Sequence, residues 1–112
     1  MLKKVISLVS LAALSCQLNA MEISVPVVSH GCDLSVGISC YIELAAPQAS
    51  QNPASCPSYN YIRWDSSSPG NASFMNALSK LQSEGKWITI GLSDTECFFG
   101  SPKAGYWRND NI

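Results

Sequence analysis

Hydrophobic and polar residues alternate along residues 33–44, 58–64 and 86–92, and this period of two is typical of strands with one buried face. In 33–44 the alternate positions that we expect to face the core are Val36, Ile38, Cys40, Ile42 and Leu44, against Gly37, Ser39, Tyr41 and Glu43. In 86–92 the two sets are Ile88, Ile90 and Leu92 against Trp87, Thr89 and Gly91. The pattern therefore predicts three half-buried strands.

Residues 66–86 change to a helical period. Apolar side chains recur at i, i+3, i+4 and i+7 and form one stripe, made of Phe74, Ala77, Leu78 and Leu81. Ser68 is the expected N-cap, Pro69 the first helical residue and Gly85 the residue that ends the helix. Because the other side is polar, the helix should pack on a sheet with one face only.

Two further strands and a long loop complete the predicted order. Residues 21–30 are β-rich, with Pro26 indicating an edge strand or a bulge, and 104–110 form the last strand. Residues 45–57 carry three prolines and are expected to be a loop, and 96–100 are short and apolar. The order β-β-β-α-β-β predicts a mainly β, α+β domain: a small five-stranded OB-like Greek-key barrel with one helix between strands three and four. A looser α+β sandwich is the alternative.

The first twenty residues have the layout of a bacterial secretory signal peptide. Lys3 and Lys4 precede an uncharged apolar run, residues 5–14, and Ala20 is the expected cleavage site. The apolar run is too short for a membrane span, which needs about 20 residues. Lipoprotein processing at Cys16 is an alternative. We expect a secreted or periplasmic protein with one domain, residues 21–112.

Removal of residues 1–20 leaves five basic residues against eight acidic ones, a net charge of about −3. This mild acidic balance gives no electrostatic reason to bind nucleic acid or to insert into an anionic membrane. The length suffices for one small core.

The four cysteines beyond residue 20 predict two disulfides, since an even number in a short exported chain is typical of a disulfide framework. Three connectivities are possible. We favour Cys40–Cys56 as a hairpin staple, with Cys32–Cys97 tying the first third of the chain to its end. A metal site is the alternative, but the chain has no C-x-x-C pair and a single histidine, so we expect no metal or other cofactor.

Catalytic chemistry has little support in the sequence. His30 lies beside Cys32 and Asp33, where a turn and an oxidised cysteine are the simpler interpretation. Asp94 and Glu96 would share one strand face, but a carboxylate pair needs a substrate cleft to act on a glycoside. No G-x-S-x-G, P-loop or G-x-G-x-x-G motif is present. We expect no enzyme activity.

Residues 58–65, SYNYIRWD, hold the densest group of rings. Alternation places Ile62 and Trp64 toward the core against the helical stripe, and Tyr59, Tyr61 and Arg63 on the outer face. Tyrosine and arginine are enriched at interfaces, and tyrosine rings stack on sugars. Tyr59, Tyr61 and Arg63 are therefore the candidate ligand-binding residues. The alternative is that they only cover the outer layer of the sheet.

Residues 36–92 carry a layout seen in one toxin family. The sequence has a strand with Cys40, a long loop to Cys56, then Trp64, a helix opening at Ser73-Phe74 and a Gly85 turn into a strand. It resembles the B subunits of the subtilase-cytotoxin and pertussis-like bacterial AB toxins. The ending "GLSDTECFFGSPK" is similar to the Gly-Leu-Ser…Cys-Phe-Gly-Pro ending of that family.

The resemblance implies an exported OB-fold chain without catalytic activity that forms a pentameric ring, binds host cell-surface glycans and accompanies a catalytic A subunit. The family has two closely spaced cysteines after Gly-Leu-Ser, where this chain has Cys97 alone, so that Cys32 is its expected partner. The family's sugar-contacting serine lies in an early strand, and the resemblance assigns it to neither Ser29 nor Ser35.

Two functions follow as hypotheses. The first is a secreted, glycan-binding B-type subunit. The second is a small secreted or periplasmic inhibitor that presents the proline-rich loop 45–57 to an enzyme, because a stiff loop loses little entropy on docking. An exported domain with neither role remains a third interpretation.

Overall fold

The computed structural model describes residues 21–35 and 37–109. Its elements are β1 (Met21–Pro26), β2 (His30–Asp33), β3 (Ser39–Glu43), the short 3-10 helix η1 (Ala49–Gln51), β4 (Tyr61–Asp65), α2 (Asn71–Glu84), β5 (Trp87–Phe98) and β6 (Ser101–Arg108). The predicted signal peptide in 1–20 lies outside the described residues, as do Val36 and the end of the last predicted strand at Asp110.

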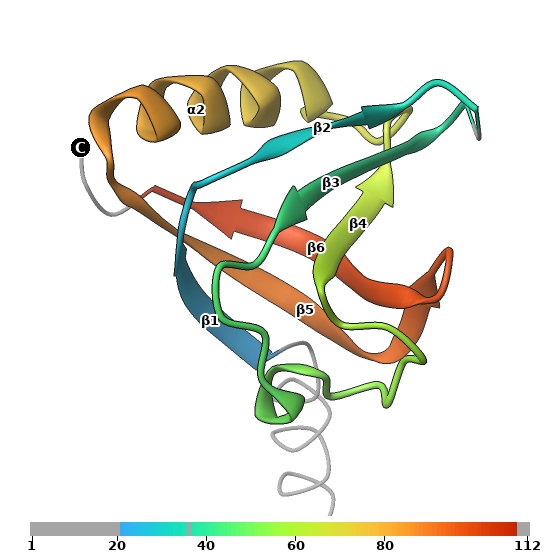
Figure 1. Ribbon diagram of the computed structural model, residues 1–112. Coiled ribbons are helices and arrows are strands. Elements are labelled where there is room, and N and C mark those ends of the chain that lie inside the picture. The colour runs from blue at the N-terminus through green and yellow to red at the C-terminus, as the bar shows by residue number, and fades with distance from the viewer. Residues whose placement is uncertain (1–20, 36, 110–112) are drawn as a thin grey trace, which may run out of the picture.

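The strands form one six-stranded sheet in the order β1-β5-β6-β4-β3-β2. The pair β4–β6 is parallel, through Arg63 and Lys103, and the other neighbours are antiparallel. Figure 1 shows α2 lying along one end of this sheet and the loop with η1 at the opposite end. The mainly β class with a single helix between the third and fourth predicted strands is confirmed for the described residues.

The predicted count of five strands is wrong, because an additional strand, β2, lies across the end of the first predicted segment and the start of the second. β1 pairs with β5, β2 pairs with β3, and residues 27–29 lie between them. The Val27 N–H donates to the Lys86 carbonyl at 3.3 Å, whereas the Ser29 carbonyl accepts from the Glu43 N–H at 2.9 Å. The chain thus changes partner strands directly after Pro26, which has no N–H of its own to donate. Since β1 and β2 are the two edges of the sheet, the pairing does not confirm a closed barrel.

β5 is longer than the predicted strand 86–92, because residues 93–98 continue it. Its register against β6 shifts on either side of Leu92, as at a bulge. The Ser93 hydroxyl oxygen accepts the backbone N–H groups of Thr95 at 3.3 Å and Glu96 at 3.0 Å. Side-chain acceptors therefore satisfy backbone groups that the irregular ladder leaves open.

The helix begins later than expected. α2 starts at Asn71 behind Gly70, which has φ of 82°, and no side chain caps it, so that Ser68 is not the N-cap. Ser68 and Pro69 instead form the preceding turn, where the Ser68 N–H donates to Asp65 and its carbonyl accepts from Asn71. Gly85 ends the helix with φ of 67°, as predicted, because glycine adopts this left-handed conformation without strain.

The core confirms the assignment of faces in β4 and α2. Ile62 and Trp64 are buried, and the predicted helical stripe is buried at Phe74, Leu78 and Leu81. The Trp64 and Phe74 rings lie 4.6 Å apart between centroids. In β3 the prediction holds for Cys40, Ile42 and Leu44, whereas Ile38 precedes the strand and is exposed.

Two disulfides are present, but both predicted pairings are wrong. Cys32 is bonded to Cys40, and Cys56 to Cys97, with Cα–Cα distances of 3.8 and 5.8 Å. Cys32 and Cys40 are direct partners across the β2–β3 hairpin, because the chain reverses direction between β2 and β3, where a continuous strand was expected. The remaining bond joins the end of the 45–57 loop to β5.

Candidate functional site

The predicted residues Tyr59, Tyr61 and Arg63 lie on the outer side of the β4 segment. Burial alternates along β4, with Ile62 and Trp64 inside and Tyr61, Arg63 and Asp65 partly exposed. Tyr59 precedes the strand and makes no hydrogen bond or ring contact with a described residue. The structure therefore brings Tyr61 and Arg63 together and leaves Tyr59 apart from them.

Arg63 is the centre of a cluster that we call the Arg63 cluster; its members are Asp33, Ser39, Tyr41, Tyr61 and Arg63. The Arg63 Nη1 donates to Asp33 Oδ2 and to Ser39 Oγ, both at 2.8 Å. Its guanidinium carbon lies 5.4 Å from the Tyr41 ring centroid and 5.3 Å from that of Tyr61. The two rings meet edge to face at 5.3 Å.

These contacts use the Arg63 guanidinium to stabilise the sheet, so that its charge is not available to a ligand. The Arg63 side chain is only 17% exposed, and its charge is balanced by Asp33. Ser39 is 1% exposed, although the alternation along 33–44 predicted an outward-facing side chain. The Arg63 side chain covers it and donates to its hydroxyl. Cation–π contacts of this kind are worth about 0.5–1 kcal/mol at exposed sites.

Three members of the cluster were not among the predicted site residues: Asp33, Ser39 and Tyr41. The cross-strand register explains their presence, because Tyr41 lies opposite Arg63 on β3 and β2 brings Asp33 opposite Ser39. The only signal in the sequence was the outward position of Ser39 and Tyr41 in the alternation, and it carried no information on which strand would lie beside them.

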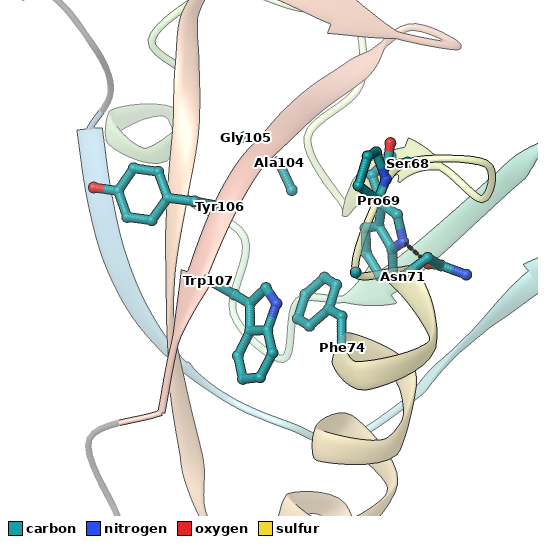
Figure 2. Close-up of a pocket in the computed structure, with 10 residues that line it drawn as sticks. Ser68, Pro69, Asn71, Phe74, Ala104, Gly105, Tyr106 and Trp107 are labelled. Atoms are coloured by element: carbon teal, nitrogen blue, oxygen red, sulfur yellow. Dashed lines mark hydrogen bonds between the residues drawn. The ribbon is translucent and has the colours of Figure 1, made fainter.

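A first hollow lies between the start of α2 and β6, and we call it the α2–β6 hollow (Figure 2). Its volume is about 80 Å³. Three rings wall it: Trp64 from β4, Phe74 from α2 and Trp107 from β6, with Phe74 and Trp107 stacked at 5.3 Å and 16°. The Trp64 Nε1–H donates to Asn71 Oδ1 at 2.7 Å.

A larger hollow of about 290 Å³ lies beside Trp87, and we call it the Trp87 hollow. Its walls are β1, the start of β5 and the loop after β3; the lining residues are Ser24, Val25, Pro26, Leu44, Ala45, Ala46, Gln48, Gln51 and Trp87. No charged side chain lines it. Trp87 is 54% exposed, so part of the residue is in contact with solvent. The prediction had placed Trp87 only as an outward residue of its strand.

The polar groups of the Trp87 hollow are unequally satisfied. Ser24 and Thr89 share a hydrogen bond of 2.9 Å between their hydroxyls, and Gln48 Oε1 accepts from Ser50 at 3.4 Å. Gln51 Oε1 is buried and has no hydrogen-bond partner among the described residues. An unsatisfied buried acceptor costs about 1–3 kcal/mol.

The other groups considered for chemistry are engaged in structural contacts. His30 bridges β2 to α2, with Nδ1 at 2.7 Å from Gln82 Oε1 and Nε2 at 3.2 Å from Ser79 Oγ. Glu96 forms an ion pair with Lys103 at 3.0 Å. Within residues 21–35 and 37–109, no group of three or more potential metal-ligating side chains comes together.

Two ionisable groups are shifted by hydrogen bonds. The Tyr106 hydroxyl donates to the Glu22 carboxylate, and this bond raises the pKa of Tyr106 above its ordinary value. The backbone N–H and hydroxyl of Ser67 donate to Asp65 and lower the pKa of that carboxyl. Both shifts come from local structural contacts at the surface.

Comparison of the chain with protein-family models, with curated proteins and with solved structures found no match. In the part of the chain that the structure describes, no helix combines the length and the apolar composition needed to cross a membrane. The two disulfides fit an oxidising, extracytoplasmic compartment.

Proposed function

We propose that the chain is a secreted, non-catalytic subunit that binds glycans, and that the Trp87 hollow is its binding site. The observation that carries the proposal is a hollow that is lined by the 54% exposed Trp87 and by Gln51, whose buried Oε1 has no described hydrogen-bond partner. A sugar has groups that suit both side chains. Its hydroxyls donate to an amide oxygen, and its C–H face stacks on an indole ring.

The chemistry of the walls favours a neutral saccharide. The polar atoms come from a serine hydroxyl and two glutamine amides, and no lining side chain is charged. The volume of about 290 Å³ lies near the lower end of small-molecule sites, which span about 300–1,000 Å³. One sugar residue with its neighbour outside the hollow suits these dimensions.

The topology supports the OB-like part of the proposal. β1 and β2 are consecutive in the chain, only residues 27–29 separate them, and they occupy the two edges of the sheet. We interpret them as the two halves of one sharply bent strand, which would bring the edges together around the single core. This arrangement suits a five-stranded OB-like barrel, as the resemblance to toxin B subunits implies.

A glycan array with the mature, disulfide-bonded protein tests the proposal. We expect binding by the wild-type chain, loss of that binding in Trp87→Ala, and retention in Phe99→Ala. Phe99 is a matched control because it is an aromatic residue at the β5–β6 turn with nearly the same exposure, 53%. Equal binding by all three proteins, or by none, would reject the site.

The assembly is tested separately by light scattering. As a B-type subunit the chain should form a closed ring, with a pentamer as the expected number, and a catalytic A subunit should be encoded by a neighbouring gene. A monomer that still binds glycans through Trp87 would remove the toxin-type assembly from the proposal and leave the lectin activity.

One observation favours the inhibitor as a second candidate. The loop 45–57 is stiff, because Asn52 donates through Nδ2 to the Cys56 carbonyl at 2.9 Å and accepts the Cys56 N–H at 2.8 Å, next to the Cys56–Cys97 bond. Residues 45–50 are exposed ahead of this anchor. A stable monomer that inhibits a hydrolase, and loses inhibition when Pro47 and Gln48 are replaced by alanine, would favour this function over the first.

A further inference from the structure

The α2–β6 hollow has a chemistry of its own, distinct from that of the Trp87 hollow. The lining sets of the two hollows share no residue. Trp64, Phe74 and Trp107 come from three different elements and surround about 80 Å³. A space of this size, walled by rings on three sides, accommodates a group of a few heavy atoms with an apolar end.

Several hydrogen-bond donors of the hollow have no partner among the described residues, and the indole N–H of Trp107 is one of them. The Trp64 N–H is engaged by Asn71 at 2.7 Å. The Trp107 Nε1–H makes no hydrogen bond with a described residue. Figure 2 shows the nitrogen-bearing edge of Trp107 turned toward Phe74, while the Tyr106 ring points the other way. Trp107 is therefore the donor on the aromatic wall that can recognise an acceptor lying beside the rings.

No side chain of the hollow supplies a charge to pair with an ionic ligand group. α2 begins at this hollow with no side-chain cap, so the N–H groups of its first turn add a positive potential that favours an acceptor oxygen. The required group thus combines a small apolar end with a neutral carbonyl oxygen.

We propose that the α2–β6 hollow binds an acetamido group, with its methyl against the aromatic rings that wall the hollow and its carbonyl oxygen accepting from Trp107 Nε1–H. This inference rests on the proposed glycan-binding function and adds a second subsite of defined specificity. The same group occurs on N-acetylhexosamines and on N-acetylneuraminic acid. Since no charged side chain lines the hollow, the neutral N-acetylhexosamine is the expected source.

The three tryptophans of the chain allow each site to be observed separately. Each contributes one indole N–H peak to a ¹H–¹⁵N spectrum, assigned with the single variants Trp64→Phe, Trp87→Phe and Trp107→Phe. The probes are the methyl glycosides of N-acetylglucosamine, glucose and N-acetylneuraminic acid. We expect the N-acetylglucosamine glycoside to shift the Trp107 indole peak, the glucoside to leave it in place, and the neuraminic acid glycoside to bind more weakly.

A functional readout accompanies the spectra. Trp107→Phe keeps a ring against Phe74 but removes the donor and part of the indole surface, so the affinity for the N-acetylglucosamine glycoside should fall at least about tenfold, the loss of one hydrogen bond. In Ala104→Val the added methyl groups narrow the hollow, and binding of the same glycoside should fall as well. Melting temperatures of both variants exclude unfolding as the cause.

The outcomes separate this inference from the proposed function. A glucoside that shifts the Trp87 peak, together with a Trp107 peak that none of the probes moves, overturns the acetamido site and leaves the first proposal standing. A Trp107 peak that moves equally with glucoside and N-acetylglucosaminide also overturns it, because the acetamido group is then not recognised. A Trp107 shift confined to the N-acetylated probes, with a silent Trp87 peak, supports the subsite and counts against the Trp87 hollow.

Discussion

The Arg63 cluster and the Trp87 hollow both present aromatic rings and polar groups at the surface, but they differ in how far those groups are satisfied. Arg63 donates twice, lies against two rings and is paired with Asp33. In the Trp87 hollow, Gln51 Oε1 is buried without a described partner. A dense cluster of tyrosine and arginine in the sequence thus became a set of internal contacts, whereas dispersed neutral residues formed the open site. The two regions therefore differ more clearly in how many of their polar atoms lack a hydrogen-bond partner than in the types of residue that form them.

The largest effect should come from Arg63→Ala. The variant removes two charge-assisted hydrogen bonds and two ring contacts and leaves the Ser39 hydroxyl buried, so the free energy of unfolding should fall by about 3 kcal/mol. Urea denaturation measures the loss. Lys103→Ala is the control, since it breaks only the exposed pair with Glu96 and should change stability by less than about 0.5 kcal/mol. If Arg63→Ala abolishes glycan binding while leaving stability unchanged, the Arg63 cluster is a binding site and not a set of structural contacts.

The second effect concerns Trp87→Ala and is expected in affinity alone. A ring that a sugar stacks on behaves as a hot spot, so calorimetric titration with the strongest glycan of the array should show about a 30-fold loss, about 2 kcal/mol. Stability should change little, because more than half of the side chain is exposed. A melting temperature that falls in parallel with the affinity would indicate a packing role for Trp87 instead.

A smaller effect is expected for Gln51→Leu, in which stability should rise while glycan affinity falls. Removing the unsatisfied acceptor should raise the free energy of unfolding by about 1 kcal/mol, because the desolvation cost of the Oε1 atom disappears. Glycan affinity should fall in the same variant. Gln48→Leu provides the stability control, since Gln48 is exposed and accepts from Ser50. A destabilised Gln51→Leu protein would mean that the amide is satisfied in solution, for example by water.

The smallest effect is the pH dependence conferred by Asp65, the residue after Trp64 at the end of β4. The two donors of Ser67 hold the pKa of Asp65 below its ordinary value of 3.8. The contribution to stability is therefore present above pH 3.8 and is lost as pH falls through the lower, folded-state pKa. Asp65→Asn should reduce the melting temperature slightly at neutral pH and match the wild type at the acid end of a pH series. A difference that grows toward low pH would contradict the sign.

Short-range patterns predicted much of this fold. The period of two correctly predicted that Ile62 and Trp64 lie in the core, and the helical period predicted the same for Phe74, Leu78 and Leu81. Both periods are visible in the sequence because the buried face of a strand or helix requires apolar side chains at regular intervals. The disulfide pairing was wrong because spacing alone does not say where a chain turns: the reversal between β2 and β3 set Cys32 opposite Cys40. The strand count failed for the same reason, because β2 is separated from both β1 and β3.

The candidate site was harder to predict than the fold. The Trp87 hollow is made by β1, the start of β5 and the loop after β3, which are distant in the sequence. Nothing near Gln51 in the chain signals that its amide oxygen is buried without a partner, because that property arises only when the three segments meet. Tyr61 and Arg63 were correctly placed on one outer face, but their partner Tyr41 depended on the strand register.

The attachment of the 45–57 loop has a consequence for how such proteins diversify. The loop leaves the sheet at β3 and is fastened again at Cys56, by the disulfide to Cys97 and by the Asn52 hydrogen bonds. Between these two anchors, residues 45–50 are exposed and carry no core side chain, although Ala45, Ala46 and Gln48 line the Trp87 hollow. Mutations there can reshape the wall of the hollow at little cost to folding. This short segment is where related chains would acquire new ligand preferences while keeping the same scaffold.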